Sequence, residues 1–508
     1  MRLLTKEQAN KLDKVAIDDY NVLGKTLMEN AGRGLANFIQ LKLIKKNKAK
    51  IGIICGKGNN GGDGFATASM LKDIGFNISI YCLIPFKEIS RDSLFFHNEC
   101  IKKNISIFYE GVAPKALPDF DLMIDAIIGT GFYGELNTTL SSWTKWLNNA
   151  KCRISVDIPS GINANTGKAS INAVKSNYTI TMGSPKIGMM LEPGKSHCGL
   201  INTIDIGLPI DLKNKKSFDW SLLENSQINS MIDNLEKTTH KYKQGKVLVL
   251  AGSVGMTGAA YLSTMGALRS GAGVTKTFAP SSLNHIYEKM ITEGITVPCD
   301  DLGNGYFIED NYDTIMSHVD WCDVIIIGPG LGLNPKTSKL VAKLIKKINK
   351  PLVIDADGFQ PFYNNTELFN KINSSFVITP HLGEFSKLTG LDNKFLEDDL
   401  PKNIDLFMNK FSGTLLLKNA PSFVAWESKG CVNSTGNPGL ATAGSGDVLT
   451  GIIASFIAQG NTIEDAAKIG MFIHGKAGDE LALEISQRGL IASDLLNTVA
   501  GVLSKYEL

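Results

Sequence analysis

The sequence lacks long hydrophobic runs and has no surplus of charge of either sign. No uninterrupted apolar run reaches the ~18 residues that a membrane-spanning helix needs. Lysine and arginine number 52 and aspartate and glutamate 50, so the net charge of +2 predicts no strong attraction to nucleic acid or membranes. The first residues lack the apolar core of a secretion signal, and Thr5 and Gln8 are instead spaced as a helix capping box. We therefore expect a cytoplasmic protein that binds neither nucleic acid nor membrane.

Cysteines in metal-binding or disulfide patterns are also missing. The eight cysteines are scattered without a C-x-x-C pair, and several lie in apolar runs typical of strands. This distribution predicts buried free thiols rather than zinc ligands or disulfides. At 508 residues, with 50 glycines and 43% hydrophobic residues, the chain is expected to form about two to four domains of α/β type.

The first half alternates strand-like runs with polar, glycine-rich segments. A β-type run at 51–55 breaks into the segment 56–64, and a helix is expected at 65–73. The segment lacks the Gly-Lys-Ser/Thr ending of a nucleoside triphosphate loop. Further strands are expected at 77–83, 121–128, 153–158 and 201–206, and in a parallel sheet the segments that follow them meet at one edge. The polar residues expected there are Asn59, Asn60, Asp63, Asp125, Asp157 and Ser160.

Each of these acids alone could be a loop-capping carboxylate, but their common position at strand ends favours a ligand site. Asp157 lies between apolar residues, which suits it to proton transfer near neutral pH. Asn60, Asp125 and Ser160 offer only hard oxygen ligands, which suit a structural cation better than a transition metal.

Segments 28–32, 56–64, 125–135 and 155–161 together resemble the NAD(P)H-hydrate epimerase domain, over about the first 210 positions. The resemblance implies inversion at the hydroxyl-bearing C6 of the hydrated nicotinamide ring, with Asp157 as acid/base. Loss and return of the hydroxyl through an iminium-like ring is our hypothesis for this step. It implies that potassium is bound by Asn60, Asp125 and Ser160. The residues that it implies for the hydrated nucleotide are Asn59, Asn60, Gly61, Gly62, Asp63, Gly129, Thr130, Gly131, Phe132, Tyr133, Gly134, Glu135 and Asp157.

A polar, lysine-rich stretch after residue 208 and an amphipathic piece at 222–235 predict a linker with a docked helix, and a domain boundary near Asp219. A second α/β run begins at residue 245. Polar residues again follow strand-like runs, and they include His381 and Lys418. His381 could be a core histidine or a ligand contact, and Lys418 is a cation suited to a nucleotide phosphate.

The stretch 437–451 contains glycines at 439, 444 and 446 and runs into an apolar segment, 448–457, that is expected to be a helix. Backbone N–H groups at a helix N-terminus bind anions. The carboxylate of Asp447 would repel a phosphate at this position, so its presence there needs a structural or a chemical reason. It is either a helix cap or a base that takes a proton from a hydroxyl attacking phosphorus.

Segments 251–253, 328–332, 355–357, 379–384, 437–447 and 474–479 resemble the ribokinase-like NAD(P)H-hydrate dehydratase, over roughly 246–504. The chain has Lys418-Asn419 where members of that family often have Lys-Gly. The resemblance implies that Ala259, Gly330, Gly332, His381 and Asp447 contact the hydrate. The residues that it implies for the adenine nucleotide and its phosphates are Lys418, Asn419, Ala420, Pro421, Ser422, Gly444, Ser445 and Gly446.

Together these features predict two three-layer α/β/α domains: a Rossmann-like domain at 1–218, and a ribokinase-like domain with a mostly parallel sheet at 219–508. The two resemblances imply a repair enzyme for NADHX and NADPHX. It would convert the R epimer at C6 to the S epimer and dehydrate the S epimer with ADP or ATP and Mg²⁺, through a phosphorylated intermediate. The fused bacterial members favour ADP and a homo-oligomer, tetrameric or larger. The alternative is a ribokinase-like small-molecule kinase fused to a non-catalytic scaffold domain.

Overall fold

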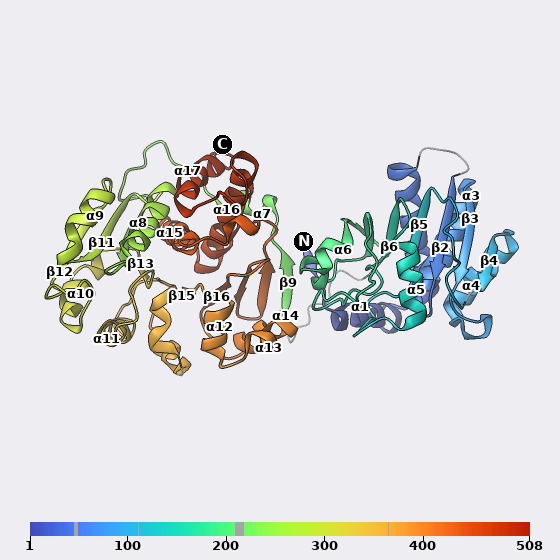
Figure 1. Ribbon diagram of the computed structural model, residues 1–508, viewed down its shortest axis with the longest axis horizontal. Coiled ribbons are helices and arrows are strands. Elements are labelled where there is room, and N and C mark those ends of the chain that lie inside the picture. The colour runs from blue at the N-terminus through green and yellow to red at the C-terminus, as the bar shows by residue number, and fades with distance from the viewer. Residues whose placement is uncertain (45–48, 110, 209–217, 364, 508) are drawn as a thin grey trace. The chain divides into compact units, whose positions relative to one another are not determined.

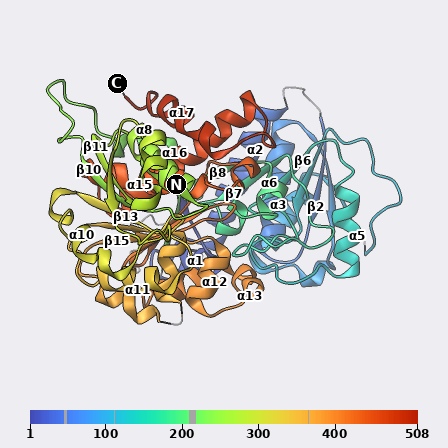
Figure 2. The same ribbon diagram turned by 60° about the vertical axis from the view of Figure 1, so that its left-hand side comes forward.

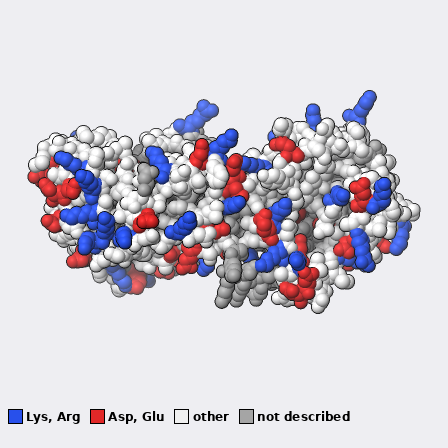
Figure 3. Space-filling model, turned by 90° about the horizontal axis from the view of Figure 1, so that it is seen from below, with Lys and Arg blue, Asp and Glu red and all other residues white. Residues whose placement is uncertain are grey.

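The protein forms two compact units, Met1–Trp220 and Ser221–Leu508, each with its own sheet (Figure 1). This computed structural model describes residues 1–44, 49–109, 111–208, 218–363 and 365–507. The predicted polar linker falls largely on residues 209–217, which lie outside the described residues. Acidic and basic side chains are interspersed over the face of each unit shown in Figure 3, in keeping with the small net charge.

The first unit is built on a parallel sheet with the strand order β4-β3-β2-β5-β6-β7-β8. In its register, Ile53 lies between Ile80 and Ile124. Apolar β-branched residues fill the central strands because these strands are covered on both faces. In chain order the strands are β2 (Lys50–Cys55), β3 (Asn77–Cys82), β4 (Ser106–Tyr109), β5 (Leu122–Ala126), β6 (Arg153–Val156), β7 (Tyr178–Met182) and β8 (Leu200–Ile204).

Helices cover both faces of this sheet (Figure 2). Ile53 packs in one buried cluster with Phe65 of α3, whereas its neighbour Ile54 packs in another with Trp143 of α5. The predicted capping box begins α1, where Thr5 and Gln8 exchange hydrogen bonds of 2.9 and 3.2 Å. The helices are α1 (Lys6–Asp18), α2 (Gly24–Phe38), α3 (Asn59–Ile74), α4 (Arg91–Lys102), α5 (Thr138–Leu147) and α6 (Gly194–Cys198). The predicted three-layer architecture is confirmed for this unit.

The second unit has the strand order β9-β18-β17-β16-β15-β14-β13-β10-β11-β12. Strands β10 to β16 pair in parallel, and the hairpin of β17 and β18 runs antiparallel beside β16. The sheet is mostly parallel, as predicted. The strands are β9 (Asp219–Leu222), β10 (Lys246–Leu250), β11 (Val274–Pro280), β12 (Ile295–Cys299), β13 (Val324–Ile327), β14 (Leu352–Ile354), β15 (Phe376–Ile378), β16 (Thr414–Leu417), β17 (Phe423–Trp426) and β18 (Lys429–Val432).

One face of this sheet packs against α8, α15, α16 and α17, and α11 and α12 lie on the other side (Figure 1). Val249 and Ile326 share a buried cluster with Ile452 of α15. The helices are α7 (Asn225–Met231), α8 (Thr257–Arg269), α9 (Asn284–Met290), α10 (Tyr312–Met316), α11 (Pro335–Leu344), α12 (Leu382–Thr389), α13 (Asn393–Asp398), α14 (Leu400–Met408), α15 (Ser445–Ala458), α16 (Ile463–Glu484) and α17 (Ala492–Leu503). Helix α7 lies within the amphipathic piece predicted at 222–235.

Two helices begin earlier than predicted. Helix α3 begins at Asn59 rather than residue 65, and α15 begins at Ser445 rather than residue 448. Each follows a glycine with positive φ, Gly58 at 97° and Gly444 at 87°, which places the next residues at once in the first helical turn. Glycine is a poor helix former. A Cβ on Gly61 would lie only 2.0 Å from the Gly56 carbonyl oxygen, so the close packing of these two segments requires glycine at position 61.

The eight cysteines are free, as predicted, and seven of them are buried. In the described part of the chain no helix is long and apolar enough to cross a membrane.

Candidate active sites

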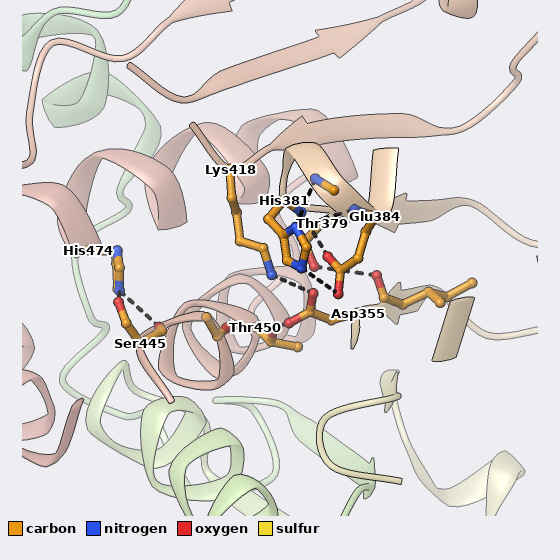
Figure 4. Close-up of polar contacts among 11 residues, drawn as sticks. Asp355, Thr379, His381, Glu384, Lys418, Ser445, Thr450 and His474 are labelled. Atoms are coloured by element: carbon orange, nitrogen blue, oxygen red, sulfur yellow. Dashed lines mark hydrogen bonds and ion pairs between the residues drawn. The ribbon is translucent and has the colours of Figure 1, made fainter. Parts of the chain in front are cut away.

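Polar side chains of the second unit meet at the carboxyl edge of its sheet, as predicted. Asp355, Thr379 and Lys418 directly follow β14, β15 and β16. The Lys418 backbone N–H donates to the Pro380 carbonyl oxygen at 2.8 Å, which places His381 beside Lys418. Figure 4 shows these side chains gathered above the start of α15.

A buried ion pair fixes the Lys418 ammonium. Its Nζ lies 2.7 Å from Asp355 Oδ1, and Thr450 Oγ1 donates to Asp355 Oδ2 at 2.9 Å (Figure 4). The Asp355 side chain is 1% exposed. Burial alone would lower the pKa of Lys418, but the charges of Asp355 and Glu384 outweigh it and the pKa is raised. Lys418 is therefore a cation with a fixed position.

The ammonium of Lys418 lies against the first turn of α15. A Cβ on Gly446 would lie 3.1 Å from Lys418 Nζ and 3.8 Å from Asp355 Oδ2. The first-turn N–H groups of a helix carry partial positive charge. In α15 those of Ser445 and Asp447 donate to the carbonyl oxygens of Thr442 (3.3 Å) and Gly444 (3.1 Å), whereas in the described ranges the Gly446 N–H has no backbone acceptor of this kind. The glycine at 446 therefore leaves room for an anion that contacts both the helix terminus and the ammonium.

Asp447 is not a helix cap. In the part of the chain that the structure describes, Gly444 is the N-cap of α15 and no side-chain hydrogen bond caps the helix. Burial, and then the negative charge of Asp355, raise the pKa of Asp447 to about 7. A carboxylate with such a pKa can accept a proton near neutral pH.

His381 is the N-cap of α12, and its ring is 59% exposed, so the core-histidine alternative is wrong. Its Nδ1 accepts the N–H groups of Gly383 (3.0 Å) and Glu384 (3.3 Å), which leaves the proton of the neutral ring on Nε2. Nε2 lies 3.4 Å from Glu384 Oε1. Burial, followed by the ammonium of Lys418, lowers the pKa of His381, while burial raises that of Glu384 to about 7.

The remaining residues predicted for this unit fall into three groups: those expected to contact the hydrate, Ser445 at the start of α15, and the turn after Lys418. Gly330 packs on Ala259, where a Cβ on Gly330 would lie 2.8 Å from the Ala259 Cβ, and the Gly332 N–H donates to Asp357 Oδ2 at 2.8 Å. Ser445 Oγ lies 3.0 Å from Nε2 of His474, whose pKa is lowered to about 4 by burial.

The third group forms a turn after Lys418. The Ser422 hydroxyl donates to the Asn419 carbonyl oxygen at 2.9 Å, and Asn419 and Ala420 are exposed, with Pro421 half-buried. Sequence reasoning gave no role to Asp355 and missed Thr450, although Thr450 follows Gly446 by one helical turn and its Oγ1 lies 2.9 Å from the Gly446 carbonyl oxygen.

In the first unit, Asp125 and Ser160 are joined directly. Ser160 Oγ donates to Asp125 Oδ1 at 2.5 Å, and the Ser160 N–H and the Ser155 hydroxyl donate to Oδ2 at 2.8 and 2.7 Å. Asp125 is fully buried, which raises its pKa, and no described lysine or arginine pairs with it. Asn60 is also buried, and among the described residues its Nδ2 has no hydrogen-bond partner.

Asp157 has a strained backbone, with a φ of 64°, just beyond the end of β6. Its Oδ1 accepts the Met182 N–H at 3.0 Å and the Thr181 hydroxyl at 3.1 Å, and it forms an ion pair with Lys186. Sequence reasoning gave no role to Thr181 or Lys186. The available signal was that Lys186 follows β7 at the same sheet edge.

Asp63 lies in the first turns of α3 with Asn59, Asn60, Gly61 and Gly62, not in a loop as predicted. The pKa of Asp63 is raised well above its usual range, first by burial and then by the charge of Asp157.

Residues 129–135 do form a loop, as predicted, but its residues differ in burial and in their contacts. Phe132 is buried, Tyr133 is 85% exposed, and Glu135 Oε2 accepts the Ser170 hydroxyl at 2.5 Å. A Cβ on Gly131 or Gly134 would meet nothing within 4 Å, whereas one on Gly129 would lie 3.2 Å from Asn60 Oδ1. Gly129 and, beside it, Thr130 are half-buried.

Known proteins resemble both units. A family model described as NAD(P)H-hydrate dehydratase matches residues 247–500, and one described as YjeF-related protein N-terminus matches residues 24–188. A bifunctional NAD(P)H-hydrate repair enzyme Nnr from Moorella thermoacetica is 34% identical over 516 residues, covering 100% of this chain and 97% of that protein. The one from Dictyoglomus turgidum is 33% identical over 511 residues, covering 98% and 97%.

A solved structure supports the fold of the second unit. The ADP/ATP-dependent NAD(P)H-hydrate dehydratase from Bacillus subtilis, co-crystallised with ATP/Mg²⁺, is 24% identical with a TM-score of 0.50, and the match covers 56% of this chain and 98% of that one. The full-length similarity to repair enzymes outweighs the alternative of an ordinary small-molecule kinase. The chain belongs to the family of bifunctional NAD(P)H-hydrate repair enzymes, which join an epimerase to a dehydratase.

Proposed function

We propose that residues 219–508 dehydrate the S epimer by phosphorylating it first, with Asp447 as the base. Asp447 takes the proton of the C6 hydroxyl, and the hydroxyl oxygen then attacks the terminal phosphoryl group of ADP or ATP. Phosphate leaves far more readily than hydroxide, so the C6–O bond breaks and loss of a C5 proton restores the dihydropyridine ring. The observation that carries this proposal is that Asp447, with a pKa of about 7, lies one residue from the anion site made by Gly446 and Lys418.

Lys418 and the first turn of α15 would stabilise the charge that develops on the phosphoryl group. Gly444, Ser445 and Gly446 supply a helix N-terminus, and Asp355 with Thr450 holds the ammonium in place before the nucleotide arrives. Preorganised donors of this kind act without reorganising during the reaction, and loss of one costs about 10²- to 10³-fold in kcat.

The nucleotide would be held by Lys418, Asn419, Ala420, Pro421, Ser422 and Gly446. The Bacillus subtilis dehydratase was co-crystallised with ATP/Mg²⁺, which supports an adenine nucleotide as co-substrate here, with ADP favoured. Mg²⁺ would accompany its phosphates. Mg²⁺ usually keeps several waters and binds through substrate phosphates with one or two carboxylates. The hydrate itself would contact Ala259, Gly330, Gly332 and His381.

Residues 1–218 would perform the epimerisation, with Asp157 as acid/base at C6 and the hydrate held between residues 59–63 and 129–135. Potassium would be bound by Asn60, Asp125 and Ser160. Their oxygens suit a hard cation, and Asp125 is a buried carboxylate without a described cationic partner, which a bound cation would balance. The ion would supply fixed positive charge beside the substrate loop.

The test is the stoichiometry of the dehydration. When the purified S epimer is incubated with ADP, the proposal predicts one AMP and one phosphate for each NAD(P)H that is formed. An ordinary kinase would instead release a stable phosphoester of the hydrate and no NAD(P)H. A homo-oligomeric assembly, tetrameric or larger, and a cytoplasmic location stay predictions.

A further inference from the structure

One oxygen of Asp157 is fully occupied by hydrogen bonds and the other is free. Oδ1 accepts from Lys186, Thr181 and the Met182 N–H. In the described ranges no hydrogen bond reaches Oδ2. The side chain is 15% exposed, so Oδ2 is the atom that remains available to a substrate.

Lys186 is a buried, rigidly held cation. The residue is 2% exposed, and its Nζ also donates to Thr181 Oγ1 at 3.1 Å and to the Met182 carbonyl oxygen at 3.4 Å. The backbone on both sides of Lys186 is tied to Leu4, whose N–H donates to Pro185 and whose carbonyl oxygen accepts from Ile187, each at 2.9 Å. A buried ammonium is costly unless it is paired and hydrogen-bonded. Among the described residues the partners of Nζ are Asp157 itself and two residues that also hydrogen-bond Asp157, Thr181 and Met182.

We propose that Lys186 is a positioning residue of the epimerase site, which holds Asp157 as a carboxylate anion with Oδ2 directed to a hydroxyl or water at C6. This inference rests on the proposed role of Asp157 in the epimerase reaction. It gives Asp157 the role of proton acceptor in the R-to-S direction and, by microscopic reversibility, that of proton donor in the reverse direction.

The other charged groups that face Asp157 agree with this assignment. They are Asp63 on α3 and Asp13 on α1, besides Lys186 itself. Burial first, and then the charge of Asp157, raise the pKa of Asp63 well above its usual range and that of Asp13 to about 6. The raised pKa of Asp63 suits it to donate a proton, whereas Asp157 lies next to the Lys186 ammonium.

The chemical step balances with these roles. The C6–O bond breaks as the N1 lone pair forms the iminium, and the departing hydroxide takes the Asp63 proton and leaves as water. A water molecule then adds to C6 from the opposite face and gives its proton to Asp157 Oδ2. Exchange with solvent returns both carboxyl groups to their starting states, so no oxidant or co-reactant is needed.

The test uses the full chain with Lys186→Met, Lys186→Gln and Lys186→Arg, and Lys195→Met as a matched control at an exposed lysine of the same unit. Conversion of the R to the S epimer is followed by chromatography across pH. Both neutral variants are expected to lose about 10²-fold or more of epimerisation at neutral pH. The shape of their pH profile should also change, because Asp157 then lacks the ammonium that pairs with it. Lys186→Arg should keep the wild-type profile, and Lys195→Met should be unchanged.

A purely structural role for Lys186 predicts a different result. Activity would then fall by the same factor at every pH, in parallel with a lower melting temperature of the first unit, and Lys186→Arg would fall with it. That result, or wild-type activity in both neutral variants, would overturn the inference. Asp157→Asn separates this outcome from failure of the proposed function: if it still interconverts the epimers, the assignment of the epimerase site itself is wrong.

Discussion

Replacing Asp447 by asparagine removes the proposed base and keeps the shape of the side chain. The pKa of Asp447 is raised from 3.8 to about 7, which corresponds to roughly 4 kcal/mol for holding the ionised carboxylate in the folded protein at neutral pH and above. Because the folded-state pKa lies above the unfolded one, this cost is absent below pH ~4 and grows as the pH rises towards 7. Asp447→Asn should therefore stabilise the second unit at pH 7.5, by at most about 4 kcal/mol.

The same variant should lose at least ~10²-fold of dehydratase turnover, since asparagine cannot accept the hydroxyl proton. The assays are denaturant unfolding at pH 7.5 and 4.5 and formation of NAD(P)H from the S epimer with ADP. A more stable but inactive variant, whose added stability falls to about 1 kcal/mol at pH 4.5, agrees with the reasoning. Turnover within tenfold of wild type, or a loss of stability that is the same at both pH values, would refute it.

Four further changes test separate parts of the account. Dehydratase turnover in the wild type should rise with pH through about 7 and level off above it, because Asp447 must be ionised to act; a flat profile between pH 6 and 8 would contradict this. Lys418→Met should lower dehydratase kcat by about 10²- to 10³-fold, while an equal loss in a control such as Lys429→Met would point to a general effect. Asp157→Asn should stop epimerisation and leave dehydration of the purified S epimer intact, as measured by epimer chromatography and NAD(P)H absorbance. Exchange of potassium for choline in the buffer, or Asp125→Asn, should slow epimerisation and not dehydration, and equal slowing of both activities would exclude a potassium site confined to the first unit.

The strands and their polar edges could be predicted because they depend on local sequence. Runs such as Val324–Ile327 and Lys50–Cys55 are short, apolar and β-branched, and parallel topology brings the residues after them to one edge. Lys418 lies beside His381, and Asp125 beside Ser160, at the predicted sheet edges, because the strands that carry them are neighbours in their sheets.

The residues that hydrogen-bond or pair with the site carboxylates could not be predicted, because they lie far from those carboxylates in the sequence and meet them only in the folded structure. Thr450 lies 95 residues from Asp355, and Lys186 lies 29 residues from Asp157. No spacing rule connects such pairs. The starts of α3 and α15 were missed for another reason: helix propensity disfavours glycine, but close packing of Gly61 on Gly56 and the positive φ of Gly444 decide those turns.

In the proposed reaction the phosphoryl group placed at Gly446 is expelled and not kept, and the first unit supplies the epimer that the second one uses. This reaction sequence is tested most directly by incubating mixed epimers of the hydrate with ADP and separating all products. The account predicts complete conversion to NAD(P)H by the wild type, and by Asp157→Asn only as much as the S epimer initially present allows. A stable phosphorylated hydrate, with no NAD(P)H recovered, would contradict it.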